Sequence, residues 1–183
     1  MASTTTTNSF AQRLIGALAL DSTIYEEVEA DRSATGQALA VVLLSSLAAG
    51  IGSRGIGGTT VPTMLFISAT ALVAWAAWAL VVFEIGGRLL PEPQTRVDVG
   101  ELLRTIGFAA TPGLLRVLGV MSAATIPVFA ITAVWMLAAM IVGVRQALDY
   151  RSTLRAIVVC GLGWALALAI ALVLGLFFGP TVS

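Results

Sequence analysis

The fold class of this chain is decided by residues 61–83, VPTMLFISATALVAWAAWALVVF, an apolar stretch without a single charge. A helix needs roughly 20 mostly apolar residues to cross the hydrocarbon of a bilayer. A charge buried at that depth is costly, and this stretch avoids the cost completely. The stretch therefore predicts a membrane-spanning helix, and Pro62 suits its first turn.

Charge is also absent between Arg32 and Arg54, between Arg116 and Arg145, and after Arg155. Only 11% of all residues are charged and 58% are hydrophobic, whereas about a quarter of the residues in a soluble domain are charged. We therefore predict an all-α fold, a polytopic integral membrane helix bundle.

The composition argues against several function classes. The net charge is zero, so no basic surface indicates nucleic acid. The chain has no His and no Lys, which removes His-based catalysis, His-ligated zinc and the phosphate-binding loop that needs Lys. Its one cysteine, Cys160, gives no disulfide within a chain. We expect no cofactor and no metal, and the absence of Lys favours a GC-rich bacterial genome.

The chain divides into a short N-terminal segment, residues 1–33, and a membrane domain, residues 34–180. Within that domain we expect spans at about 34–52, 61–88, 126–144 and 155–178, separated by a glycine-rich loop at 50–60 and a proline-containing loop at 91–99. The glycine-rich loop contains GIGSRG, which matches the G-x-G-x-x-G pattern of dinucleotide-binding proteins. In those proteins the pattern follows a strand, so we interpret it here as a plain loop.

Residues 101–121 leave two alternatives: a third span kinked at 111–113, or a surface helix followed by one long span over 117–144. Five spans with a cytoplasmic N-terminus place only Arg54 and Arg116 toward the outer face, whereas four spans move the arginines of residues 145–155 outside, against the positive-inside rule. We therefore favour five spans, with the third kinked or partly interfacial, an outer turn at 122–127 and the C-terminus on the outer face. The cytoplasmic arginines are then Arg13, Arg32, Arg88, Arg96, Arg104, Arg145, Arg151 and Arg155.

The N-terminal segment predicts two short helices, and it is too small to hold a core of its own. Residues 10–20 favour an amphipathic helix on the membrane surface, with Arg13 and Gln12 pointing away from an apolar face. That face consists of Phe10, Leu14, Ala17 and Leu18. Residues 21–31 are acidic, and Thr23 and Glu26 have the spacing of a capping box that would begin the second helix.

Charged residues beside the spans form the first candidate site. On a continuous helix, one side of the 101–116 segment carries Glu101, Arg104, Thr105, Phe108, Pro112 and Arg116. Glu84 has two possible partners, Arg88 and Arg104. These residues indicate either a polar pocket or ion path, or charges that end the spans and snorkel, which is the interpretation we favour. The candidate polar intramembrane residues are Glu84, Arg104, Pro112 and Arg116.

Residues 144–155 form a cytoplasmic turn and the second candidate site. Arg145 and Asp149 are four residues apart and can pair, and Ser152 or Thr153 can cap the last span. The arginines suit anionic lipid headgroups, and the acidic residues 26–29 suit either a soluble partner or plain solvation. The candidate partner or headgroup contacts are Glu26, Glu27, Glu29, Arg145, Asp149, Tyr150, Arg151 and Arg155.

Three segments resemble the Yip family of Ypt/Rab-interacting membrane proteins, in its bacterial form. They are residues 144–156, VRQALDYRSTLRA; residues 107–112, GFAATP; and the Leu20-Asp21 pair followed by residues 25–29, YEEVE. The resemblance implies five spanning helices and a cytoplasmic N-terminus. Eukaryotic members are adaptors for prenylated Rab-type GTPases and other Yip proteins. This chain lacks their long N-terminal domain and its Asp-Leu-Tyr-Gly-Pro signature, which argues against Rab-type GTPase binding.

Three functions follow from these observations. The first is a non-enzymatic membrane scaffold or adaptor in a bacterial cytoplasmic membrane, contacting lipids and either a second copy or another membrane protein. The alternative is a small transporter or lipid-moving protein that uses Glu84, Arg104 and Arg116. A membrane enzyme is the weakest, because its acid-base candidates Glu84, Glu101 and Asp149 form no recognisable catalytic set.

Overall fold

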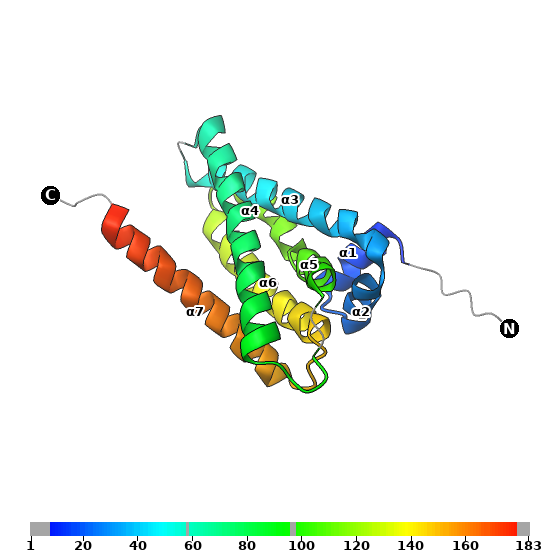
Figure 1. Ribbon diagram of the computed structural model, residues 1–183. Coiled ribbons are helices and arrows are strands. Elements are labelled where there is room, and N and C mark those ends of the chain that lie inside the picture. Colours follow the sequence, from blue (N-terminus) through cyan, green and yellow to red (C-terminus); the bar gives the residue numbers. More distant parts are fainter. Residues whose placement is uncertain (1–7, 58, 96–97, 179–183) are drawn as a thin grey trace.

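The computed structural model describes residues 8–57, 59–95 and 98–178, with side chains through residue 166, and these residues contain helices and no strand (Figure 1). The α-helices are α1 (Phe10–Leu18), α2 (Ser22–Ala30), α3 (Thr35–Gly52), α4 (Val61–Glu84), α5 (Val99–Phe108), α6 (Thr125–Ala147) and α7 (Thr153–Phe178). Shorter helical segments are the 3-10 helices η1 (Arg32–Ala34), η2 (Ser53–Ile56) and η4 (Thr111–Val120) and the π-turn η3 (Ile85–Leu89). The prediction of an all-α bundle is confirmed.

Three helices of the described ranges are long and apolar enough to cross a membrane: Arg32–Ile56, Val61–Leu89 and Thr125–Ala147. They match the expected spans at 34–52, 61–88 and 126–144. The last expected span coincides with α7, whose side chains are described only to Leu166. The predicted loop at 50–60 is wrong in its first half, because residues 50–56 continue as helix in α3 and η2.

The ambiguous segment after residue 100 forms α5 and then the 3-10 helix η4, broken at Ala109 and Ala110. It runs parallel to α3 and makes close backbone contacts along its length. Gly107 packs on Ala38 and Gly113 on Ser45, and further along Gly52 meets the Arg116 carbonyl. Since the contacts advance in the same direction on both segments, the two point toward the same end of the bundle.

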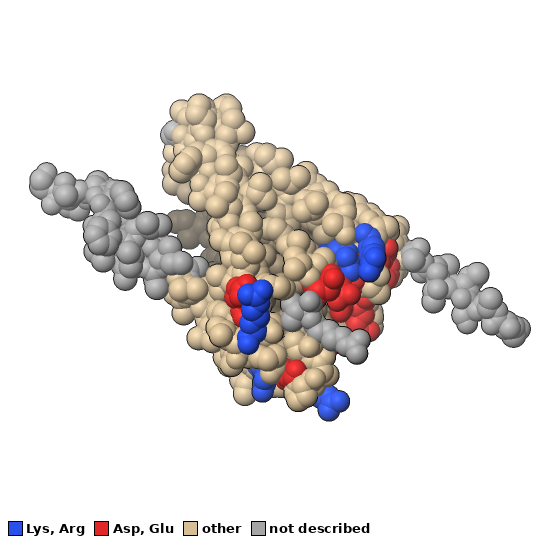
Figure 2. Space-filling view, in the orientation of Figure 1, with Lys and Arg blue, Asp and Glu red and all other residues tan. Residues whose placement is uncertain are grey.

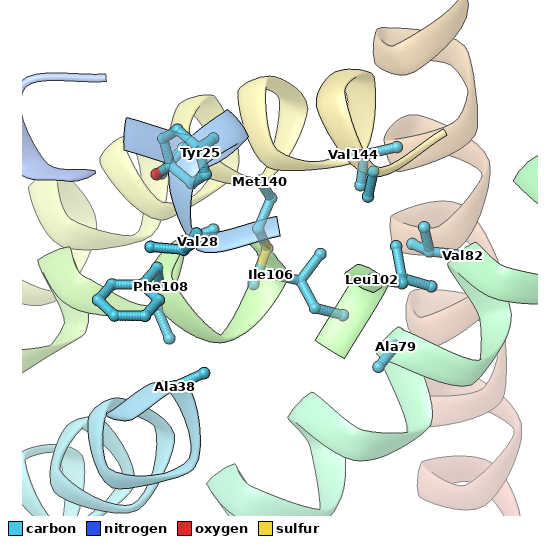
Figure 3. Close-up of a cluster of buried hydrophobic side chains, with 14 of the residues drawn as sticks. Tyr25, Val28, Ala38, Ala79, Val82, Leu102, Ile106, Phe108, Met140 and Val144 are labelled. Atoms are coloured by element: carbon cyan, nitrogen blue, oxygen red, sulfur yellow. The ribbon is translucent and has the colours of Figure 1, made fainter. Parts of the chain in front are cut away.

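The N-terminal helices share the core of the bundle. Tyr25 and Val28 of α2 are buried with residues of α3, α4, α5 and α6, as Figure 3 shows. Phe10 of α1 packs its ring edge-on against Phe108, with the ring centroids 6.3 Å apart. The apolar face expected on residues 10–20 therefore lies against protein. Because the N-terminal segment packs into the core of the bundle, it does not need a core of its own.

One local prediction at this end is corrected. The second helix begins at Ser22, and the Asp21 carboxylate accepts the Thr23 backbone N–H at 3.0 Å, so the expected Thr23–Glu26 capping box does not form. The Asp21 carboxylate, at the N-cap position two residues before Thr23, is a stronger acceptor for this N–H group than a threonine hydroxyl. A capping box forms instead in α1, between Ser9 and Gln12.

The turn between η4 and α6 is shorter than expected. It occupies residues 121–124, because α6 already begins at Thr125 and includes Pro127 in its first turn. The Thr125 hydroxyl donates to the Gly119 carbonyl at 2.6 Å and so closes the end of η4. This bond draws the start of α6 toward η4.

The parallel contact predicts a strong effect of one methyl group. A Cβ at Gly52 would lie 1.9 Å from the Arg116 carbonyl, whereas a Cβ at Gly36, in the same helix, meets nothing within 4 Å. Gly52→Ala should lower the free energy of unfolding by about 1–3 kcal/mol through overpacking. Gly36→Ala should leave it unchanged or slightly higher. Denaturation of both variants in mild detergent checks this, and equal stabilities would contradict the close contact.

Candidate functional site

The described N-terminal residues 8–34 form what we call the cap, and Arg13 lies at its centre. The Arg13 side chain is only 2% exposed, and its Nη2 contacts the carboxylates of Glu27 at 2.9 Å and Asp31 at 2.6 Å. Its Nη1 donates to the Gln37 side chain of α3 at 3.0 Å. The expectation that Arg13 points away from the packed face is therefore wrong. A buried arginine is stable here because two carboxylates and an amide oxygen surround it.

The carboxylates of this cluster stay ionised at neutral pH. The Ser33 side chain and Arg13 lower the pKa of Asp31 to about 2. Burial alone would raise the pKa of Glu27, but hydrogen bonds from Asn8 and Arg13 outweigh it and lower the value. Both acids therefore remain charged partners of Arg13 throughout the physiological pH range.

Two further side chains fix the cap to the bundle. Arg104 of α5 donates from Nε to the carbonyls of Val28 at 3.0 Å and Glu29 at 3.1 Å, which are among the last carbonyls of α2 and lack partners within that helix. A guanidinium at this position also complements the negative end of the helix dipole. Trp135 of α6 donates from Nε1 to the Leu18 carbonyl at 2.9 Å, at the end of α1.

A polar groove of about 350 Å³ lies beside the cap at the same end of the bundle. It is lined by Glu26, Glu29, Arg145, Gln146, Asp149, Tyr150 and Arg151, so it collects six of the eight candidate cytoplasmic contacts. Gln146 of α6 donates to the Glu26 carboxylate at 2.7 Å and closes one wall. Burial, with the nearby charges of Asp149, Glu101 and Glu26, raises the pKa of Glu29 to about 7. The groove thus combines three acids with two arginines, and Glu29 is only partly ionised near neutral pH.

The expected pair between Arg145 and Asp149 does not form. Arg145 Nε donates instead to the Tyr150 carbonyl at 3.3 Å. Asp149 lies beyond the end of α6 with a left-handed φ of 51°, which turns its side chain off the helical face that i,i+4 pairing requires. At the start of α7, the Glu92 carboxylate accepts the Arg151 backbone N–H at 3.2 Å, and no side-chain cap from Ser152 or Thr153 is found among the described atoms.

Three of the candidate contacts, Tyr150, Arg155 and Glu27, bond to groups that do not line the groove. Tyr150 is buried, and its hydroxyl donates to the carbonyls of Gly86 at 2.7 Å and Leu90 at 2.9 Å, which holds the end of α4 against the turn. Arg155 pairs with Glu92 at 3.3 Å. Glu27 faces Arg13 in the cap.

The four candidate intramembrane residues do not converge on one site. Glu84 pairs with Arg88 at 2.9 Å on an exposed surface, and the alternative partner, Arg104, is occupied by the cap. Pro112 is buried in the first turn of η4. Arg116 and Glu84 line different cavities, so the hypothesis of a joint polar path through these residues lacks geometric support.

The Arg116 cavity, about 320 Å³, lies between α4, η4, α6 and α7. Arg116 Nε donates to the Thr132 hydroxyl at 3.3 Å, and its guanidinium stacks over the Phe129 ring at 5.5 Å. The other lining residues are Ala71, Ala74, Trp75, Trp78, Ala133, Met136, Met140 and Trp164. Across the described ranges, no group of His, Cys, Asp or Glu has the arrangement of a metal site.

Arg13 is the important residue that the sequence reasoning missed. The available signal was the i,i+4 spacing of Glu27 and Asp31, which places both carboxylates on one face of their segment. The identity of their cation depends on how α1 folds back over α2, and no local pattern encodes that return.

Loss of the Arg13 cation should loosen the cap. Arg13→Met leaves two carboxylates without their shared partner and should lower stability by about 2 kcal/mol. Amide exchange in residues 10–30 should accelerate in the same variant, because α1 loses its tie to α2 and α3. Arg32→Met, at an exposed position of the same segment, is the matched control and should change little. Unaltered exchange in Arg13→Met would refute the anchoring role.

Comparison with known families agrees with this architecture. The Yip1 domain model matches residues 18–175, which include α2 through most of α7. Searches of the curated proteins and of the solved structures give no match. The match confirms the resemblance noted at residues 107–112 and 144–156, and it agrees with three helices long and apolar enough to cross a membrane. The chain therefore belongs to the Yip1 domain family and is an integral membrane protein.

Proposed function

We propose that this protein is a non-enzymatic membrane scaffold whose cap presents a fixed docking surface to a partner. The observation that carries the proposal is the anchoring of α1 and α2 through Arg13, Arg104 and Trp135. A surface that is already ordered loses little conformational entropy when a partner binds. The partner is a second copy of the chain or another membrane protein, and the surrounding lipids complete the environment.

The partner face is the polar groove together with the exposed part of α2. Glu26 and Asp149 are exposed there, and Arg151 adds a cation on the rim. On the face drawn in Figure 2, acidic and basic atoms gather around α2 and the lower end of the bundle, while the upper end is uncharged. Such a mixed surface favours a partner whose acidic and basic groups are arranged to complement it.

The topology that we propose has five spans, with residues 1–33 on the cytoplasmic side and the membrane domain over 34–180. The parallel contact of α3 with α5–η4 supports a third crossing in the same direction as the first. Ten α-helical residues rise about 15 Å and ten 3-10 residues about 20 Å, which together match a hydrocarbon core of about 30 Å. In this arrangement the cap is on the side of a bacterial cytoplasmic membrane that faces the cytoplasm, and α1 reaches toward the middle of α6, where Trp135 bonds its last turn.

Cysteine labelling distinguishes this topology from four spans. In a Cys160→Ala background, single cysteines replace Thr59, Ser122 and Asp149. With an impermeant maleimide on intact cells, Thr59→Cys and Ser122→Cys should be labelled, and Asp149→Cys should be labelled only after permeabilisation. Four spans place Asp149 outside and Ser122 within a helix, so labelling of Asp149→Cys in intact cells would overturn five spans.

Site-specific photocrosslinking tests the scaffold role. A benzoylphenylalanine at position 26, on the partner face, should give one product of defined mass in native membranes, because the docked partner lies within reach. The same residue at position 73, on the exposed apolar surface of α4, is the control and should give no such protein product. Only uncrosslinked monomer from positions 26 and 149 alike would count against a scaffold.

A further inference from the structure

The Arg116 guanidinium lines a cavity and has no carboxylate to pair with in the described part of the chain. Within the described part of the chain, the Thr132 hydroxyl is the only hydrogen-bond partner of the Arg116 guanidinium, and no carboxylate lies within ion-pair distance. The other arginines that lie deep in the fold differ from it. Arg13 has two carboxylates, and Arg104 has two carbonyls. Arg116 is half-buried, and a cation partly withdrawn from water without an anion is costly, which points to an anion supplied from outside the chain.

A second polar group of the same cavity also lacks a partner. The Trp78 side chain is 8% exposed, and its Nε1–H is buried without an acceptor in the described structure. By contrast, the indole of Trp75 donates to the Ile106 carbonyl at 3.4 Å, and that of Trp135 donates to Leu18. The Trp78 N–H lies against Gly163 of α7 and is closed off from the cavity, so the donor that the cavity offers is the Arg116 guanidinium, and its ligand should carry acceptor atoms.

The rest of the lining is apolar and accessible from the bilayer. Met136, Met140 and the alanines form the walls, and the volume of about 320 Å³ falls at the small end of ligand pockets. Ala74 of α4 and Trp164 of α7 line the cavity and are exposed, so it reaches the apolar outer surface between these helices. A molecule that enters there comes from the lipid phase.

We propose that this cavity is a binding site for an anionic membrane lipid. The lipid phosphate lies at the Arg116 guanidinium, and one acyl chain packs against the rings of Trp75 and Trp78 and against Met140. A guanidinium offers paired donors to phosphate oxygens, and the aromatic rings suit an acyl chain. A zwitterionic lipid would also bring its own cation into a cavity whose lining contains no carboxylate. The site should therefore discriminate by net charge. It stands independently of the scaffold role, since it lies on other residues.

Native mass spectrometry of the full chain in detergent tests the site, with equal amounts of phosphatidylglycerol and phosphatidylcholine added. The wild-type protein should retain one phosphatidylglycerol with about tenfold or greater preference, because the choline cation of the other lipid would be desolvated beside Arg116 without a carboxylate to pair with it. Arg116→Leu should lose the preference, and Arg116→Lys should keep part of it. Arg54→Leu removes an exposed arginine outside the cavity and is the matched control.

Brominated lipids give a second readout that does not depend on recovering Arg116→Leu in folded form. Brominated phosphatidylglycerol should quench the tryptophan fluorescence of the wild-type protein more strongly than brominated phosphatidylcholine. A Trp135→Phe background removes the signal of the one described indole outside the cavity. Equal retention and equal quenching by the two lipids would overturn the proposal. Tight binding of oleate but not of phosphatidylglycerol would also overturn it, because the ligand would then be a fatty acid. The absence of quenching by either lipid would overturn it as well, because the cavity would then bind no lipid.

Discussion

The close parallel contact between α3 and the α5–η4 segment is the constraint on which the rest of this structure depends. Glycines along the contact bring the two backbones together, and side chains larger than hydrogen would meet carbonyl or hydroxyl oxygens there. The contact fixes the direction of the segment between α4 and α6. It also places α5 where Arg104 reaches the end of α2, and η4 where Arg116 lines the cavity. Cap and cavity are thus two consequences of one packing arrangement.

A 3-10 helix within an apolar bundle has to satisfy the carbonyls that its change of hydrogen-bond pattern releases, because no water in a hydrocarbon phase can do so. Two threonines do this at the ends of η4. Thr111 donates its hydroxyl to the Phe108 carbonyl at 2.5 Å, and Thr125 donates to the Gly119 carbonyl at 2.6 Å. The segment is also packed between α3 and α6, so protein rather than lipid covers its irregular backbone. A longer rise per residue lets this short segment follow the full length of α3.

The distribution of partners among the arginines connects structure with the two proposed activities. Arg13 and Arg104 are used internally and hold the cap, whereas the arginines around the polar groove remain at a surface where a partner protein can reach them. Among the described residues Arg116 has no carboxylate partner, and its side chain lines a mostly apolar cavity. The partner surface and the lipid site lie on different residues of one bundle. The effect of lipid composition and the effect of partner binding can therefore be measured separately.

The sequence by itself determined the fold class, because charge-free windows of sufficient length have one low-energy solution in a membrane. It also determined the approximate bounds of the spans at 61–88 and 126–144, which depend on local composition. It left Glu84 with two possible partners, of which the structure selects Arg88, and it placed the break of the third segment at 111–113, whereas α5 already ends at Phe108. Only the tertiary structure decided that Arg13 is buried, that α3 continues through its glycines, and that Asp149 turns away from Arg145. Each of these features depends on a segment distant in the chain. The burial of Arg13 requires α2 to fold over α1, and the close contact of Gly52 requires η4 beside it. The residues next to Arg13 and Gly52 in the sequence do not indicate either neighbour.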